Sequence, residues 1–360
     1  MKKNILELCL SPDLGGLELF MLGCIEHFSK KTKLFIAIVP EKKLHNTLSG
    51  NNLFLLKRNK LFPFLPAMKL AHFIDKNNID IIHFHWTKDI ATVVLAKLLS
   101  KRKPKVIQSR HMRMTRFKDD VYHKWLYKHI NLVHAVTHQV KEQLETFIPA
   151  DIRPNIEVVH PGTTIPMVNK EEKECLIEKY ALKDHFVVGM VGRIEEAKGQ
   201  YILLDAVARL NTLDLKVLIV GQAMNNAYLQ TLKEKTVQLG IEKKVIFTGF
   251  TTAVDTHIQL CNLTVLATEE ETFGLVVIES MANGVPVIAT NKGGPLEIIT
   301  HGINGLLFDR TAEDLSNKIQ MLYDDASLHL TISKHALESV KEKFNAHKQL
   351  NILYRIINES

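Results

Sequence analysis

Short apolar runs alternate along nearly the whole chain with longer stretches in which apolar residues recur at helical spacing. This alternation is typical of βαβ units, in which helices join parallel strands. The expected strands of the first half are residues 4–10, 34–39, 52–56, 79–85, 105–109, 132–137 and 156–160. Those of the second half are residues 186–192, 215–221, 244–250, 263–267, 285–289 and 305–309. The pattern predicts an α/β protein with two doubly wound parallel sheets.

The chemistry of the chain changes near residue 166. Two prolines and a glycine at positions 161, 162 and 166 are followed by a charged run, which is typical of a linker. Two helical stretches, 311–323 and 328 to the C-terminus, follow the last expected strand and have no strands of their own to cover. We therefore expect an N-terminal domain at residues 1–166 and a C-terminal domain at residues 167–337.

The composition is that of a soluble globular protein, with 46% hydrophobic and 24% charged residues. No apolar stretch reaches the ~18 residues that a membrane span needs. Glu7 interrupts the apolar run at the N-terminus, which also lacks a signal-peptide cleavage site. The four cysteines have neither disulfide nor zinc spacing. These features predict a cytoplasmic protein that has no metal site and touches membranes only peripherally.

Charge is divided unevenly between the two halves. Residues 1–165 contain 26 Lys and Arg against 14 Asp and Glu, a net charge of +12, whereas residues 166–360 have a net charge of −5. A basic half is expected to meet an anionic partner, and the anionic surface of a membrane is one such partner. A nucleic acid is another, but the chain has no recognisable nucleic-acid-binding motif. We therefore expect no nucleic acid partner.

Two candidate sites follow strands of the first half. Gly15 and Gly16 join the first expected strand to a helix, where backbone amides and the helix dipole could meet a phosphate. The alternative is that they only form a tight turn. His111 follows a strand directly and could donate, accept or transfer a proton. With 17 histidines in the chain, a structural role for any one of them is the alternative, and it is favoured for His83, His85, His134 and His160.

Two cations lie in one strand-to-helix loop of the second half. Arg193 and Lys198 are flanked by Gly192 and Gly199, which permit unusual backbone angles. A fork-shaped guanidinium and a point-charged ammonium suit a diphosphate. An ordinary surface loop is the alternative.

Two carboxylates bracket the start of another helix in the second half. Glu271 precedes this helix, and Glu279 lies two turns inside it among apolar residues. A carboxylate in such surroundings is costly to bury unless it is hydrogen-bonded, and sugar hydroxyls could supply those bonds. The backbone amides of Phe273, Gly274 and Leu275 could hold phosphate or sugar oxygens. The alternative is that Glu279 faces water and Glu271 only caps the helix.

Together these segments resemble the group 1, or family 4, retaining glycosyltransferases of the GT-B fold. The resemblance rests on GRIEEAKG, on the two glutamates Glu271 and Glu279 with seven residues between them, and on GGPLEII followed by GINGLLF. It implies two facing Rossmann-like domains with the active site in the cleft between them. It also implies that a C-terminal helix, from about residue 338, crosses back onto the N-terminal, acceptor-binding domain.

The resemblance implies a role for each candidate residue. Arg193 and Lys198 would bind the diphosphate of a nucleoside diphosphate sugar, and Gly16, with Gly15 beside it, would approach the same group. Glu279 would hold the nucleotide ribose, and Glu271 would contact the transferred sugar. The amides of Phe273, Gly274 and Leu275 would lie beside that sugar, and His111 would contact the sugar or the diphosphate.

The function that follows is transfer of a hexose-type sugar, with retention, from a UDP-, GDP- or other nucleotide sugar. The acceptor would be a glycan or a lipid-linked molecule, in synthesis of lipopolysaccharide, capsule or O-antigen at the inner face of the cytoplasmic membrane. No DxD motif is present, so the resemblance implies metal-independent donor binding and no cofactor. The alternatives are a sugar-nucleotide epimerase of the same fold and, from another class, a basic nucleic-acid-binding protein.

Overall fold

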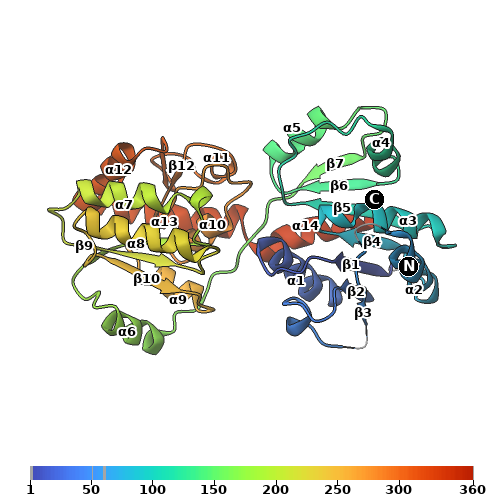
Figure 1. Ribbon diagram of the computed structural model, residues 1–360, viewed down its shortest axis with the longest axis horizontal. Coiled ribbons are helices and arrows are strands. Elements are labelled where there is room, and N and C mark those ends of the chain that lie inside the picture. Colours follow the sequence, from blue (N-terminus) through green and yellow to red (C-terminus); the bar gives the residue numbers. More distant parts are fainter. Residues whose placement is uncertain (1–2, 51, 60–61, 360) are drawn as a thin grey trace. The chain divides into compact units, whose positions relative to one another are not determined.

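The computed structural model describes residues 3–50, 52–59 and 62–359, which divide into two units (Figure 1). Unit 1 comprises Met1–Pro161 and Ala346–Ser360, and unit 2 comprises Gly162–Asn345. Each unit contains one parallel β-sheet with helices on both faces. The predicted class, two doubly wound parallel α/β sheets, is confirmed.

The sheet of unit 1 has seven strands in the order β3-β2-β1-β4-β5-β6-β7. They are β1 (Ile5–Cys9), β2 (Leu34–Ile38), β3 (Leu53–Leu55), β4 (Ile81–Phe84), β5 (Lys105–Arg110), β6 (Leu132–Ala135) and β7 (Asn155–Val158). Each strand overlaps a predicted apolar run, because strands covered by helices on both faces are apolar on both sides. The parallel register places Glu7 of β1 beside His83 of β4, so an acid and a histidine meet inside the core.

Helices cover both faces of this sheet. They are α1 (Gly16–Ser29), α2 (Phe64–Lys76), α3 (Ile90–Leu99), α4 (Val121–Tyr127), α5 (His138–Phe147) and α14 (Ala346–Glu359), with short 3₁₀ turns η1 (His45–Thr47) and η2 (Thr87–Asp89). Helices α2, α3 and α5 pack on one face of the sheet, and α1 and α14 pack on the other. The carboxyl ends of the strands carry the loops that hold the candidate residues of this unit.

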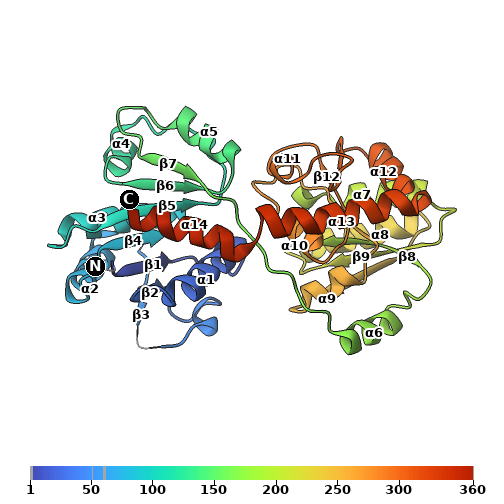
Figure 2. The ribbon, with the colours of Figure 1, turned by 180° about the vertical axis from the view of Figure 1, so that it is seen from behind.

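The last helix of the chain returns to unit 1. Leu353 and Ile357 of α14 are fully buried in the same apolar cluster as Ile5 and Phe28. The rings of Tyr354 and Phe28 are 5.3 Å apart. Figure 2 shows α14 lying along unit 1 and the preceding helix α13 lying along unit 2. A C-terminal helix that joins the N-terminal Rossmann-like unit is therefore part of the fold, as predicted.

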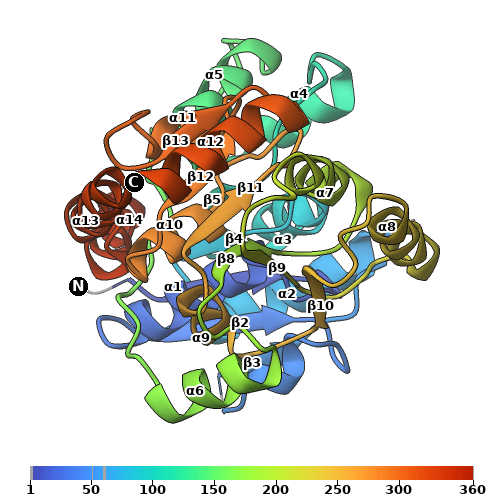
Figure 3. The same ribbon diagram turned by 90° about the vertical axis from the view of Figure 1, so that its left-hand side faces the viewer.

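The sheet of unit 2 has six strands in the order β10-β9-β8-β11-β12-β13. They are β8 (Phe186–Val191), β9 (Leu215–Val220), β10 (Val245–Gly249), β11 (Leu263–Leu266), β12 (Val287–Thr290) and β13 (Leu306–Phe308). The helices are α6 (Lys170–Lys179), η3 (Glu196–Lys198), α7 (Gln200–Arg209), α8 (Asn226–Gln238), α9 (Val254–Gln259), α10 (Leu275–Ala282), α11 (Pro295–Ile298), α12 (Ala312–Asp324) and α13 (Ala326–Lys343). In Figure 3, α7, α8 and α12 lie on one face, and α9, α10 and α13 lie on the other.

The borders between the units differ from the predicted positions 166 and 338. The Thr163 amide donates to the Phe344 carbonyl at 2.8 Å, which ties the chain after Pro161 to unit 2. Helix α13 buries Ala336 and Val340 in the core of unit 2. The helical tail therefore changes units at Asn345/Ala346, because the apolar face of α13 belongs to the second core and that of α14 to the first. Among the described residues, no helix is long and apolar enough to cross a membrane.

Candidate functional site

The cationic loop of unit 2 follows strand β8 and is held against the end of β11. Gly199 has φ +79°, and a Cβ placed there would lie 2.4 Å from the carbonyl oxygen of Ala267. The Glu269 amide donates to the Ala197 carbonyl at 3.0 Å, which joins the two strand ends. Only glycine fits this close approach without strain. The glycine therefore fixes where the ammonium group of Lys198 can lie.

Lys198 and Glu271 form an ion pair at the carboxyl edge of the second sheet. The Lys198 Nζ donates to Glu271 Oε2 at 3.0 Å, and the two side chains are 24% and 20% exposed. The Gly294 amide donates to the Glu271 carbonyl at 2.9 Å, and a Cβ on Gly294 would lie 2.3 Å from the Cα of Phe273. The two predicted motifs around Glu271 and Gly294 thus fit together tightly. Each charge of the pair remains reachable by a ligand.

Arg193 lies in the same loop as Lys198 but is much more exposed. Its side chain is 62% exposed, and its guanidinium pairs with Glu195 at 3.0 Å. Its carbonyl accepts a hydrogen bond from the Gln200 side chain at 3.0 Å, so the backbone is anchored while the side chain is not. An anion at this edge would compete with Glu195 for the guanidinium.

Helix α10 begins beside the Lys198–Glu271 pair. Gly274 precedes it with φ +100°, and Phe273 is buried, its ring 6.0 Å from that of Phe344. The side chain of Phe273 therefore belongs to the core, and only the backbone of this segment can face a ligand. The first amides of a helix have no partner within the helix, so the amides of Leu275 and Val276 are donors for an anion or a sugar oxygen, whereas the Val277 amide donates to the Gly274 carbonyl at 2.9 Å.

Glu279 projects from the second turn of α10. Among the described residues its carboxylate has no hydrogen-bond or ion-pair partner. Burial, together with the nearby carboxylate of Asp255, raises the pKa of Glu279 to about 7. The side chain is half-buried, so it does not simply face water. A carboxylate in this state gains from any ligand that offers hydroxyl donors.

A separate hollow of about 460 Å³ lies at the other end of the second sheet. Its walls include His185 and Val187 at the start of β8 and Asn262, which precedes β11. Ligands of doubly wound sheets bind at the carboxyl ends of the strands. Because this hollow lies at the amino ends of β8 and β11, it is remote from the charged carboxyl edge, and none of the predicted site residues lines it.

The glycine loop of unit 1 leads into α1. The Gly15 amide donates to Glu18 Oε2 at 2.8 Å, so a carboxylate already caps this helix. Gly16 is the first helical residue and is exposed. Its amide and that of Leu17 lack helical partners by position. The amides of Gly16 and Leu17 are therefore available to donate to a phosphate, whereas the Gly15 amide already donates to Glu18.

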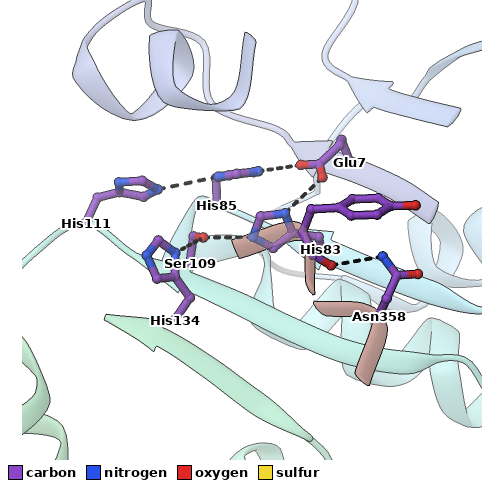
Figure 4. A network of polar contacts seen from close by, with 8 residues as sticks. Glu7, His83, His85, Ser109, His111, His134 and Asn358 are labelled. Atoms are coloured by element: carbon purple, nitrogen blue, oxygen red, sulfur yellow. Dashed lines mark hydrogen bonds and ion pairs between the residues drawn. The ribbon is translucent and has the colours of Figure 1, made fainter. Parts of the chain in front are cut away.

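His111 lies at the end of a hydrogen-bonded chain that runs through the core of unit 1 (Figure 4). Its Nε2 is 3.4 Å from Nδ1 of His85, and the Nε2 of His85 is 2.6 Å from Glu7 Oε2. The Phe20 ring packs edge-on against His111, with centroids 4.9 Å apart. Glu7 and His85 are fully buried or nearly so. The position of His111 is therefore set from inside the sheet.

A second branch runs from Glu7 to the backbone. His83 Nδ1 is 2.9 Å from Glu7 Oε1, and His83 Nε2 is 2.7 Å from Ser109 Oγ. Ser109 Oγ is 2.7 Å from His134 Nδ1, and His134 Nε2 is 2.8 Å from the Val159 carbonyl. A carbonyl only accepts, so His134 donates from Nε2. Burial lowers the pKa of His134 to about 3, so its ring is neutral and Nδ1 accepts from Ser109.

The hydrogen-bond roles then determine the remaining protons. Ser109 donates to His134, so it accepts from His83 Nε2, and Glu7 accepts from His83 Nδ1. His83 therefore carries both ring protons and forms a buried ion pair with Glu7. Its neighbourhood supports this, because the histidines lower the pKa of Glu7 to about 2 against the opposing effect of burial.

The branch to His111 is neutral. Burial lowers the pKa of His85 to about 4, so His85 donates to Glu7 from Nε2 and presents an acceptor at Nδ1. Burial and the adjacent histidines hold the pKa of His111 well below its usual range. His111 then donates from Nε2 to His85, which leaves its Nδ1 as an acceptor. The charge-carrying role that a histidine could have near neutral pH is thus not available to this ring.

Glu7, Ser109 and the histidines other than His111 were not expected to matter for the site. The sequence pattern that could have indicated this network is a single acid, Glu7, in the apolar run of residues 4–10, together with histidines at the alternate positions 83 and 85. Glu7, Cys24 and His83 also place ligand atoms within 4.8 Å of one another. Both oxygens of Glu7 already accept from histidines, and burial raises the pKa of the Cys24 thiol. We therefore interpret this cluster as a hydrogen-bond network.

Two parallel, doubly wound sheets, with cations, carboxylates and open helix amides at the carboxyl edge of the second, define an α/β enzyme that binds an anionic, hydroxyl-bearing ligand. A family model described as glycosyl transferases group 1 matches residues 167–339, and one described as glycosyltransferase family 4 matches residues 33–165. The chain belongs to this family of retaining glycosyltransferases, which use nucleotide sugars, as the resemblance implied.

Several known proteins are similar over long stretches. N-acetyl-alpha-D-glucosaminyl L-malate synthase of Bacillus anthracis is 28% identical over 294 residues, 78% of this chain and 75% of that protein. The lipopolysaccharide core biosynthesis glycosyltransferase LpsE of Rhizobium meliloti is 31% identical over 160 residues, 44% of this chain and 46% of that protein. The crystal structure of Anabaena HepE in complex with UDP superposes with a TM-score of 0.86 at 21% identity and covers 100% of both chains. The GT-B fold is thereby confirmed.

Proposed function

We propose that this enzyme transfers a hexose-type sugar from a nucleoside diphosphate sugar to a glycan or a lipid-linked acceptor. The pathway would be synthesis of a surface glycan of the lipopolysaccharide, capsule or O-antigen type. The similarity to a lipopolysaccharide core glycosyltransferase supports this class of acceptor. The net charge of +12 over residues 1–165 supports an acceptor that is presented at an anionic surface.

Unit 2 would hold the donor. The observation that carries the proposal is the Lys198–Glu271 pair beside the start of α10, with Glu279, whose carboxylate has no partner among the described residues, in the second turn of that helix. Lys198 and Arg193 would bind the diphosphate, which would draw Arg193 away from Glu195. Glu271 would then contact the transferred sugar beside the amides of residues 273–275, and Glu279 would accept from the ribose hydroxyls.

The reaction would need no protein nucleophile. The acceptor hydroxyl oxygen would bond to the anomeric carbon on the face from which the diphosphate leaves, while the bond from that carbon to the phosphate oxygen breaks. The departing phosphate oxygen would take the hydroxyl proton. Negative charge develops on the diphosphate as it leaves, so the main demand on the protein is stabilisation by Lys198 and Arg193.

Unit 1 would supply neutral contacts to the same reaction. Gly16, with Leu17 after it, would offer backbone amides to the diphosphate, while the amide of Gly15 stays bonded to Glu18. His111 presents an acceptor at Nδ1, which suits a sugar or acceptor hydroxyl and does not suit a phosphate oxygen. We therefore assign His111 to a hydroxyl group in preference to the diphosphate.

The proposed place of action is the cytoplasmic face of the cytoplasmic membrane. Basic residues near an anionic bilayer gain about 1 kcal/mol each from the surface potential. Flotation with vesicles that contain phosphatidylglycerol should carry the protein upward at low salt and release it at high salt. Failure to float at low salt would contradict this placement and would leave the donor site untouched.

The first test measures thermal stability in the presence of UDP-, GDP-, ADP- and TDP-sugars. A ligand at 100 times its dissociation constant adds about 2.7 kcal/mol to the free energy of unfolding. One nucleotide class should stabilise the wild type and leave a Lys198→Ala, Glu271→Ala double variant unchanged. The matched control replaces the neighbouring pair of Lys292 and Glu270, which lie 3.2 Å apart and are more exposed, with alanine. Equal losses in both double variants would contradict the assigned site.

A further inference from the structure

A hollow of about 560 Å³ opens in unit 1 at the carboxyl ends of β2 and β3. It is lined by Pro40, Leu55, Leu56, Lys57, Arg58, Asn59, Leu65, Pro66 and Lys69. Its volume falls within the ~300–1,000 Å³ of small-molecule sites. The carboxyl edge of a parallel sheet is where ligands bind, and none of the candidate site residues described above lines this hollow.

The walls of this hollow are cationic. Among the described residues, no aspartate or glutamate lines it, whereas Lys57, Arg58 and Lys69 do. The side chains of Lys57 and Lys69 are exposed and have no hydrogen-bond or ion-pair partner within the described part of the chain. Two unneutralised ammonium groups at one hollow favour an anionic ligand.

Arg58 is held in place behind the two lysines. Its guanidinium stacks over the Trp86 ring at 4.9 Å, and its Nε is 3.8 Å from Asp89 Oδ1. Asp89 is itself fixed, because its buried Oδ2 accepts the Leu10 amide at 2.8 Å. Its Oδ1 has no hydrogen-bond partner among the described residues. A guanidinium held on one side in this way keeps its other N–H groups for a phosphate.

Leu65, which lines the cationic hollow, belongs to a group of large exposed apolar side chains around the start of α2. Phe62, Phe64, Leu65 and Met68 are 49–68% exposed, and they lie at or just before the start of α2. Folded surfaces seldom leave several large apolar side chains together in water unless they bind something. A cationic hollow with an apolar rim matches a molecule that carries a phosphate at one end and hydrocarbon at the other.

We propose that this hollow binds the phosphate of a lipid-linked acceptor between Lys57, Arg58 and Lys69, while Leu65 and Met68 contact the hydrocarbon chain. The inference rests on the proposed function, because it names the chemistry of the acceptor that the enzyme would glycosylate. The acceptor phosphate is separate from the donor diphosphate, which unit 2 would hold.

Binding of farnesyl phosphate, measured by titration calorimetry below its critical micelle concentration, tests this inference. Wild type should bind farnesyl phosphate at least about tenfold more tightly than inorganic phosphate or farnesol. Inorganic phosphate lacks the hydrocarbon chain, and farnesol lacks the phosphate. A Lys57→Glu, Lys69→Glu variant should lose at least about tenfold in affinity. A Lys101→Glu, Lys128→Glu variant changes the net charge of unit 1 equally at exposed sites and should bind as wild type does.

A second variant examines the apolar rim. Leu65→Ser with Met68→Ser should weaken binding of farnesyl phosphate and leave the weaker binding of inorganic phosphate unchanged. Equal affinity of the Lys57, Lys69 variant and wild type for farnesyl phosphate would overturn the inference. A second result would also overturn the inference: phosphatidylglycerol vesicles bind in a manner that depends on Lys57 and Lys69, but monomeric farnesyl phosphate does not bind. The hollow would then bind the headgroups of a bilayer and not a single lipid phosphate.

The donor assay separates this inference from the proposed function. Stabilisation by a nucleotide sugar should be the same in wild type and in the Lys57, Lys69 variant, since the proposed donor residues belong to unit 2. Normal donor binding with no farnesyl phosphate binding overturns the acceptor inference alone. If no nucleotide sugar stabilises the wild-type protein, the proposed function itself is overturned.

Discussion

The two sheets of this protein handle charge in opposite ways. In unit 1, Glu7 is fully buried and both of its oxygens accept from buried histidines. In unit 2, Lys198 and Glu271 pair at the sheet edge with about a fifth of each side chain exposed. A buried, satisfied network holds its members in one arrangement, whereas a half-open pair can exchange partners when a ligand arrives. The first arrangement therefore positions groups, and the second can bind.

Removing the buried charge of unit 1 should have the largest effect on stability. Glu7→Gln leaves the doubly protonated His83 without its counter-ion, and breaking a buried pair costs about 3–5 kcal/mol. Urea denaturation followed by circular dichroism should show this loss. Glu157→Gln, on an exposed strand position, should change stability by less than about 0.5 kcal/mol. A loss below about 1 kcal/mol for Glu7→Gln would mean that the network carries no buried ion pair.

Removing the half-buried cation Lys198 of unit 2 should instead affect turnover. Lys198→Ala should lower kcat by about 10²–10³, the cost of losing one preorganised charge-stabilising group, with little change in stability. Lys292→Ala is the matched control, because that lysine also pairs with a glutamate at the same sheet edge. Initial rates with the donor identified by thermal stability measure both. Similar rates for the two variants would remove Lys198 from the diphosphate site.

The buried histidines should make the protein acid-sensitive. Burial lowers the pKa of His85 to about 4 and of His134 to about 3, so the folded chain stays neutral there while the unfolded chain binds protons below about 6.5. Their contribution to stability is complete above pH 6.5 and declines as the pH falls toward 4. Each such group contributes a slope of about 1.4 kcal/mol per pH unit in this window. His85→Gln should flatten the measured curve, and an unchanged slope would contradict the neutral assignment.

Glu279 should show a smaller effect of opposite sign. Its pKa is raised to about 7, so it costs the folded state nothing at low pH and destabilises it as the pH rises from about 4.5 through 7. Glu279→Gln should therefore raise the free energy of unfolding at pH 8 by about 1–2 kcal/mol and leave it unchanged at pH 4. The same variant should bind the nucleotide sugar more weakly. Greater stability with unaltered donor binding would mean that Glu279 holds no ribose.

The sequence by itself determined the architecture and the candidate donor loops. Apolar runs of strand length mark every strand of both sheets, because strands buried on two faces cannot carry polar residues freely. The glycine, cation and carboxylate motifs are local, since each occupies one strand-to-helix loop. Arg193, Lys198, Glu271 and Glu279 could therefore be selected without coordinates, although nothing in the chain order shows that Lys198 meets Glu271.

Only the tertiary structure decided which distant residues meet. Glu7 faces His83 because β1 pairs with β4, and His85 falls beside the same carboxylate two positions further along. Ser109 and His134 join through the neighbouring strands. Likewise, the helical tail divides at Asn345/Ala346 because its two helices bury their apolar faces in different cores. Strand order and long-range packing are properties of the whole chain, so a local sequence pattern cannot show which acidic side chain pairs with which basic side chain.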